Sequence, residues 1–168
     1  PYFFTSNHAS ALDIPLAFAG IPNWLVSVAK IELKSVLILG WVMSTGGHIF
    51  VDRKNREKAY KSLEDAKKSL KKSPRSVLLF PEGTRTENGN LLKIKTGGIN
   101  MAIEMGIPII PVACKGTFEM LKNNAKSVGD GVLELRIGEP IMTGNGKKVN
   151  KHEIAILIKE KIENLLNY

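Results

Sequence analysis

The stretch SNHASALD, residues 6–13, holds a histidine and an aspartate with four residues between them. Side chains on one face of a helix are three or four positions apart, so a step of five does not stack them. His8 and Asp13 can meet only if the histidine precedes a helix and the aspartate lies in its first turns. The carboxylate would then fix one imidazole tautomer, and the second ring nitrogen could take a proton from a hydroxyl group. The pair is therefore a candidate general base.

A helix cap is the alternative interpretation of the same stretch. Ser10-Ala-Leu-Asp13 matches a capping box, in which a serine is followed three residues later by an acid. Pro15 is compatible with a helix start at this point. Asp13 would then serve only the helix end, and these residues alone leave both interpretations open.

Two further apolar runs end in charged residues. FPEGTRT, residues 80–86, places a carboxylate, a glycine and a guanidinium at the end of a strand-like run. The glycine permits close backbone approach, and Arg85 can bind a phosphate through two hydrogen bonds. GGHIFVDR, residues 46–53, ends in an acid and an arginine. Each segment alone could be a surface turn with an ion pair, but three such ends, His8 included, indicate one anion-binding pocket.

The elements that would position these residues alternate along the chain. Short β-branched or aromatic runs predict strands at 2–6, 24–29, 48–52, 76–80, 108–113 and 131–138. Apolar periodicity predicts helices at 11–19, 32–43, 55–72, 97–105 and 150–166. This alternation predicts an α/β fold with a mixed, largely parallel sheet flanked by helices. Ligands of such sheets bind beyond the carboxyl ends of the strands, where all the candidate residues would lie.

The chain has 168 residues, which we interpret as a single domain over residues 1–168. Its formal net charge is +8, and ten of its basic residues lie between Arg53 and Arg75. This bias favours an anionic partner such as a phospholipid surface, an acidic carrier protein or a phosphorylated small molecule, although a solvated lysine-rich helix face explains it as well. No nucleic-acid-binding motif is visible, so we expect no nucleic-acid partner.

Several other classes of site find no support. The histidines and the single Cys114 lack metal-ligand spacing, so no metal is expected, and His48 and His152 are interpreted as structural or exposed. No dinucleotide fingerprint or complete phosphate loop is present, so no cofactor is expected. No run reaches the length of a membrane span; the longest, VLILGWVM at 36–43, could either touch lipid or pack against the sheet.

Taken together, the motifs resemble those of the glycerolipid acyltransferases. NHASALD is similar to their His-x4-Asp motif, and GGHIFVDR, FPEGTR and IPIIPVA (107–113) are similar to their second, third and fourth blocks, in family order. The segments AKIEL (29–33) and KTGGINMAIEMGIP (95–108) also resemble the family. The similarity covers about residues 3–140 and is greatest to the bacterial 1-acylglycerol-3-phosphate acyltransferases. It implies the glycerol-3-phosphate acyltransferase-like fold.

The resemblance also implies roles for individual residues. His8 would be the base acting on the 2-hydroxyl of lysophosphatidic acid, and Asp13 would orient it. The implied substrate-binding residues are Lys30, Arg53, Glu82, Gly83, Thr84 and Arg85, with the arginines on the phosphate. The acyl donor would be acyl-CoA or acyl-carrier protein, the product phosphatidic acid, and no covalent enzyme intermediate would form. We expect the protein at the cytoplasmic face of the bacterial inner membrane, peripheral or anchored by a segment outside this sequence.

Three other functions stay open at this point. A related acyltransferase could act on glycerol 3-phosphate or another lysolipid, since the motifs separate these acceptors poorly. A non-catalytic module that binds anionic lipid would not require His8. A thioester hydrolase would use His8 to activate water.

Overall fold

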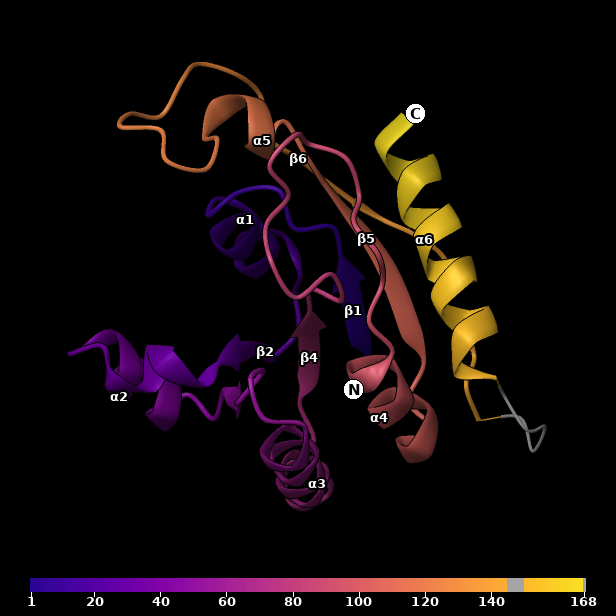
Figure 1. Ribbon diagram of the computed structural model, residues 1–168. Coiled ribbons are helices and arrows are strands. Elements are labelled where there is room, and N and C mark those ends of the chain that lie inside the picture. Colours follow the sequence, from indigo (N-terminus) through magenta and orange to yellow (C-terminus); the bar gives the residue numbers. More distant parts are fainter. Residues whose placement is uncertain (145–149, 168) are drawn as a thin grey trace.

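The computed structural model describes residues 1–144 and 150–167, and it contains one six-stranded sheet (Figure 1). The strands are β1 (Phe3–Ser6), β2 (Leu25–Lys30), β3 (Ile49–Val51), β4 (Ser76–Leu79), β5 (Ile109–Lys115) and β6 (Glu134–Ile137). They lie in the order β3-β2-β4-β1-β5-β6. All neighbouring pairs are parallel except β5 and β6, which are antiparallel. The predicted mixed, largely parallel sheet is confirmed.

The remaining elements are α1 (Asp13–Gly20), the 3-10 helix η1 (Ile31–Ser35), α2 (Leu39–Thr45), α3 (Arg56–Lys72), α4 (Gly97–Met105), α5 (Thr117–Met120) and α6 (Lys151–Asn167). Successive strand residues point to opposite faces of the sheet, which gives it two apolar cores. On one face, strand residues such as Phe3 and Val77 pack with residues of α3, α4 and α6. On the other, Phe4 and Leu78 pack with Ala17 of α1. The sheet is therefore covered on both faces, as its largely parallel pairing requires.

The prediction of one helix over 32–43 is wrong. The chain forms η1, turns at residues 36–38, and only then begins α2. The apolar residues that suggested a helix do not face the sheet, and Leu37 is 89% exposed. The helix α5 was not predicted, because one turn is too short to give a periodic signal. The strand expected over 131–138 is confined to β6.

No helix within the described residues is long and apolar enough to span a bilayer. The same part of the chain contains no cluster of three or more histidine, cysteine or acidic side chains suited to a metal ion.

Candidate active site

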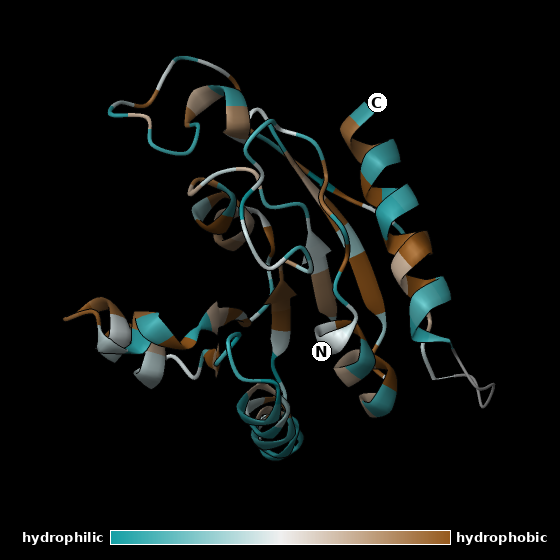
Figure 2. Cartoon of the chain, in the orientation of Figure 1, coloured by the Kyte–Doolittle hydropathy of each residue, from teal (hydrophilic) through white to brown (hydrophobic). Residues whose placement is uncertain are grey.

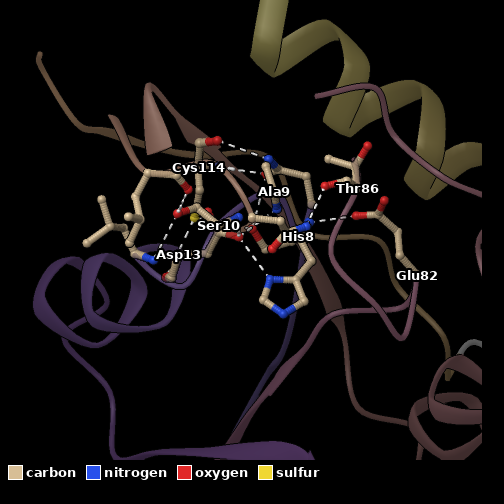
Figure 3. A network of polar contacts seen from close by, with 12 residues as sticks. His8, Ala9, Ser10, Asp13, Glu82, Thr86 and Cys114 are labelled. Carbon is tan, nitrogen blue, oxygen red and sulfur yellow. Dashed lines mark hydrogen bonds and ion pairs between the residues drawn. The ribbon is translucent and has the colours of Figure 1, made fainter. Parts of the chain in front are cut away.

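The candidate residues lie where β1 and β4 end. These strands are parallel neighbours, with Phe4 opposite Leu78, so the loops that follow them leave the sheet side by side. The backbone N–H of His8 donates to Oε1 of Glu82 at 2.6 Å. The backbone N–H of Thr86 donates to the carbonyl oxygen of His8 at 2.9 Å. Two motifs that are 74 residues apart in the sequence therefore form one hydrogen-bonded unit (Figure 3).

The histidine and the aspartate of the first motif are in direct contact. Nδ1 of His8 lies 2.9 Å from Oδ2 of Asp13, whose carboxylate is fully buried. The same oxygen accepts the backbone N–H groups of Ala9 at 2.7 Å and Ser10 at 2.8 Å. These contacts all converge on Oδ2, whereas the second oxygen, Oδ1, is buried with no hydrogen-bond partner among the described residues. Asp13 thus fixes both the His8 ring and the turn that carries it (Figure 3).

The contacts of Ser10 show how far the capping box forms. Its backbone N–H reaches Asp13, which is one half of the box. Its hydroxyl accepts from the backbone N–H of Leu12 at 3.2 Å and donates to the carbonyl oxygen of Leu121 at 2.7 Å, so the second half is absent. Leu12 is the residue before α1 and makes no side-chain cap. Both interpretations of the motif therefore hold in part, because one carboxylate contacts the backbone and the imidazole together.

The His8 ring contacts Asp13 and Phe80 and keeps one free nitrogen. It stacks on Phe80, with ring centroids 4.2 Å apart and planes inclined by 22°. Because an aspartate oxygen accepts from Nδ1, the tautomer with hydrogen on Nδ1 is favoured and Nε2 carries a lone pair. Nε2 has no hydrogen-bond partner among the described residues, and the side chain is 16% exposed. This nitrogen is the one available for proton transfer.

Asn7 ties the loop to the neighbouring strand β5. Its Nδ2 donates to the carbonyl oxygen of Cys114 at 3.0 Å, and its Oδ1 accepts the Cys114 backbone N–H at 2.8 Å. The Cys114 thiol is buried and lies 3.4 Å from the hydroxyl of Ser6. Burial raises the pKa of Cys114 to about 12, so the group is a neutral thiol at physiological pH. Cys114 therefore packs in the core, as expected from the sequence.

Glu82, in the loop after β4, connects two other segments of the site. Only 2% of the residue is exposed, and its second oxygen, Oε2, accepts the backbone N–H of Leu92 at 2.7 Å. Burial raises the pKa of Glu82, and the two backbone N–H donors oppose that rise. Both oxygens are thus engaged in joining the His8 loop to the 87–95 segment. This geometry favours a positioning role for Glu82 over direct contact with a phosphate.

Two cations lie around Gly83, and one of them, Arg53, was predicted from the sequence. The guanidinium of Arg53, which follows β3, donates to the Gly83 carbonyl oxygen. Gly83 has a φ of +75°, and a Cβ added there would lie 2.7 Å from Nζ of Lys95. The positive φ favours a glycine at this position, and the flexible end of the Lys95 side chain lies against it. Thr84 and Arg85 follow on the exposed surface of the same turn.

Two of the predicted cations extend their side chains to solvent. Arg85 and Lys30 are exposed, and neither side chain makes a hydrogen bond or an ion pair with any described residue. Lys30 ends β2, the strand next to β4, and directly precedes η1. The structure therefore brings His8, Asp13 and Glu82 into one unit, joins Arg53 to Gly83, and leaves Lys30, Thr84 and Arg85 facing solvent.

Sequence reasoning did not single out Lys95. Its backbone N–H donates to the carbonyl oxygen of Pro81 at 2.9 Å, which brings the 87–95 segment back onto the β4 loop. The sequence shows a lysine shortly before two glycines at the start of a predicted helix. Nothing in the local sequence shows that this segment packs against the loop after β4. The other two histidines lie apart from this unit. His48 precedes β3 with Nδ1 2.8 Å from the Ser27 hydroxyl, and His152 is exposed on α6.

Comparison with known proteins agrees with this geometry. The Acyltransferase family model matches residues 1–115, a segment that contains every candidate residue. This chain belongs to the acyltransferase family. The resemblance inferred from its four motifs is confirmed.

Three relatives illustrate the similarity. The chain is 33% identical over 168 residues to a 1-acyl-sn-glycerol-3-phosphate acyltransferase of Saccharomyces cerevisiae, an alignment that covers 99% of this chain and 55% of that protein. It is 31% identical over 160 residues to the enzyme of the same name from Haemophilus influenzae, covering 95% and 66%. The crystal structure of the 1-acyl-sn-glycerophosphate acyltransferase PlsC from Thermotoga maritima superposes with a TM-score of 0.79 at 26% identity, covering 98% and 66%. The chain thus spans about half to two thirds of these relatives.

Proposed function

We propose that this acyltransferase-family chain moves a fatty acyl group from a thioester to the 2-hydroxyl of 1-acyl-sn-glycerol 3-phosphate, giving phosphatidic acid. The observation that carries the proposal is the 2.9 Å contact between His8 Nδ1 and Asp13 Oδ2, with Nε2 left free. The names of the relatives support the acceptor, since those proteins are 1-acyl-sn-glycerol-3-phosphate acyltransferases.

The proposed reaction needs one base and no enzyme nucleophile. Nε2 of His8 takes the proton of the acceptor hydroxyl as its oxygen attacks the thioester carbonyl carbon. The Asp13 carboxylate, in contact with Nδ1, stabilises the imidazolium that forms. The tetrahedral intermediate then expels the thiolate, which receives the proton from His8 and leaves as a thiol. Cys114 takes no part, because its pKa of about 12 keeps the thiol protonated.

The acceptor phosphate is proposed to bind at the cations around Gly83. Arg53 is already oriented there by its bond to the Gly83 carbonyl. Arg85 is exposed two residues further on, and a guanidinium can grip a phosphate through two hydrogen bonds. Lys95 lies against Gly83 and adds a third positive charge. Lys30 is proposed to contact the phosphate or the developing oxyanion.

The donor is proposed to be acyl-CoA or acyl-carrier protein, without a further cofactor. Both are anionic thioester carriers, so the net charge of +8 suits either. Holding donor and acceptor together contributes roughly 7–11 kcal/mol to such a reaction, and a positioned base about 10²–10⁴-fold. We place the protein at the cytoplasmic surface of a bacterial inner membrane, where a lysolipid acceptor would be found.

Thiol release from palmitoyl-CoA, measured with and without lysophosphatidic acid, tests the proposal. We expect release that requires the acceptor and that falls by about 10²–10⁴-fold in His8→Ala. His152→Ala is the matched control, since this histidine is exposed on α6 and should be dispensable. Release without acceptor would indicate a hydrolase instead. Equal rates with glycerol 3-phosphate in place of the lysolipid would indicate a different acceptor.

A further inference from the structure

Residues 36–42 form an exposed apolar projection, called here the apolar tip. Leu37 is 89% exposed, Ile38 72% and Trp41 70%, and Val36, Leu39 and Val42 are also exposed. Figure 2 shows this brown segment at the outer end of η1 and α2, away from the sheet. Other strongly exposed apolar side chains, such as Val132 and Ile156, are far from it in the sequence. A contiguous exposed apolar patch marks an interaction site, whereas scattered single residues do not.

The tip has a defined backbone. Ile38 has φ 67° and ψ −60°, and the Leu39 N–H donates to the Leu37 carbonyl oxygen at 2.8 Å, which makes residues 37–39 a tight γ-turn. This turn is rare and strained, especially at a β-branched residue. Gly40 packs so closely on η1 that an added Cβ would lie 2.1 Å from the Lys34 carbonyl oxygen. Strain of this kind persists where the surrounding structure imposes it, and here it presents Leu37 and Ile38 to solvent.

Positive charge flanks the tip. The cations nearest to it in the chain and in the adjoining β3 loop are Lys30, Lys34, Arg53 and Lys54, against the two carboxylates Glu32 and Asp52. An ion pair of 3.3 Å between Lys54 Nζ and Glu32 Oε1 holds the β3 loop to η1. Arg53 in that loop bonds to Gly83 of the candidate active site. The tip is therefore joined through η1 to the edge of the sheet where His8 lies.

We propose that the apolar tip inserts into the interfacial layer of an anionic phospholipid membrane, with Leu37 and Ile38 deepest and Trp41 at the level of the headgroups. Aliphatic residues beside a tryptophan and lysines are the composition of interfacial membrane anchors. The flanking cations would be attracted to anionic headgroups. A stable protein interface uses about 20–30 residues a side, and a seven-residue projection falls well short of that.

The inference rests on the proposed function in one respect, since a lipid acceptor would reach the site from the surface that the tip enters. With the tip inserted, Lys30 and Arg53 would lie near the headgroups. The acceptor phosphate and hydroxyl could then reach the cations around Gly83 and the His8 base, while the acyl chain stays in lipid.

Co-sedimentation with vesicles tests the tip directly. The vesicles contain equal parts of phosphatidylglycerol and phosphatidylcholine, and the chain is compared with Leu37→Asp and Val132→Asp. We expect Leu37→Asp to lower the partition coefficient about tenfold or more, because an acidic residue in the apolar layer is strongly disfavoured. Val132 is 77% exposed and lies outside the tip, so Val132→Asp should bind within about twofold of the original chain. Equal binding of all three proteins would overturn the proposal.

Tryptophan fluorescence gives an independent measurement, because the chain has only Trp24 and Trp41. In Trp24→Phe, brominated phosphatidylcholine should quench the emission, which then comes from Trp41 alone. In Trp41→Phe, the remaining Trp24, which precedes β2 at the opposite end of that strand from Lys30, should be quenched less. Absence of quenching at Trp41 would contradict insertion. Gel filtration that shows Leu37→Asp changing only the oligomeric state would assign the tip to self-association and overturn the proposal.

The failure of this inference can be told apart from failure of the proposed function. His8→Ala should bind vesicles as the original chain does, because His8 lies outside the tip. A chain that binds vesicles through the tip but transfers no acyl group would leave the inference standing and remove the function. A chain that transfers acyl groups but binds vesicles independently of Leu37 would leave the function standing and overturn the inference.

Discussion

The His8 loop and the apolar tip both follow strands of one sheet, yet they are held in opposite ways. The loop is buried, and a single oxygen of Asp13 receives the Ala9 N–H, the Ser10 N–H and the His8 ring. The tip exposes its apolar side chains and includes a strained γ-turn at Ile38. A site that moves protons requires fixed geometry supplied by polar contacts. A surface that enters lipid requires unsatisfied apolar area, which reduces stability in water.

Removing the Asp13 carboxylate should give the largest loss of stability. Asp13→Ala leaves the buried N–H groups of Ala9 and Ser10 without their acceptor, at a cost of about 3 kcal/mol in the free energy of unfolding. Leu37→Ala should cost less than about 0.5 kcal/mol, since its side chain is 89% exposed. Urea denaturation of both variants checks the contrast. Similar losses at the two positions would contradict the distinction drawn between loop and tip.

Truncating Arg85 should affect substrate use and leave stability unchanged. The Arg85 side chain is exposed and has no hydrogen-bond or ion-pair partner among the described residues, so its proposed role is to bind the phosphate of the acceptor. Arg85→Ala should raise the KM for lysophosphatidic acid about ten- to a hundredfold and change that for the thioester little. Arg56→Ala, at an exposed position at the start of α3, is the control. If steady-state kinetics show that the KM rises equally for lysophosphatidic acid and for the thioester, Arg85 lies outside the phosphate site. We expect Lys95→Ala to have a smaller effect of the same kind.

Glu82 should make the stability of the loop depend on pH. Its pKa is raised in the folded protein, mainly by burial, from a usual value of 4.5. A raised carboxyl pKa means that the folded state binds the proton more tightly, so the stabilisation is full below the unfolded pKa and is lost as the pH rises through the folded pKa. Glu82→Gln removes this titration and should gain stability relative to the original chain as the pH rises above about 4.5. Denaturation at a series of pH values measures the difference. A difference in the free energy of unfolding that stays constant with pH would show that Glu82 has the same pKa in the folded and unfolded states.

The smallest expected effect concerns the strained residue of the tip. Ile38→Gly relieves a positive φ, which should raise the free energy of unfolding by about 0.5–1 kcal/mol. The same change should weaken vesicle binding, because it deletes a side chain that is 72% exposed. Thermal denaturation measures the expected gain in stability, and co-sedimentation measures the expected loss of vesicle binding. A destabilised variant would show that the turn at Ile38 is not under strain.

The sequence was most informative where a feature is local. The pairing of His8 with Asp13 needs only a turn and the helix after it, so the octamer could suggest it, and the three other motifs favoured it over a helix cap alone. The contact of Glu82 with His8 could not, because it depends on β1 being inserted between β4 and β5. Neither the order of strands nor the return of Lys95 onto the β4 loop leaves a periodic signal. The single helix predicted over 32–43 failed for a physical reason, since its apolar residues suggested a buried face and instead point to solvent.

One measurement tests the central claim most directly. It follows thiol release and phosphatidic acid formation in the same reaction of palmitoyl-CoA with lysophosphatidic acid, for the original chain and for His8→Ala. Direct transfer through the His8–Asp13 pair predicts one phosphatidic acid for each thiol released, and the loss of both products together in the variant. Thiol release that exceeds phosphatidic acid, or phosphatidic acid formation that survives in His8→Ala, would contradict the account.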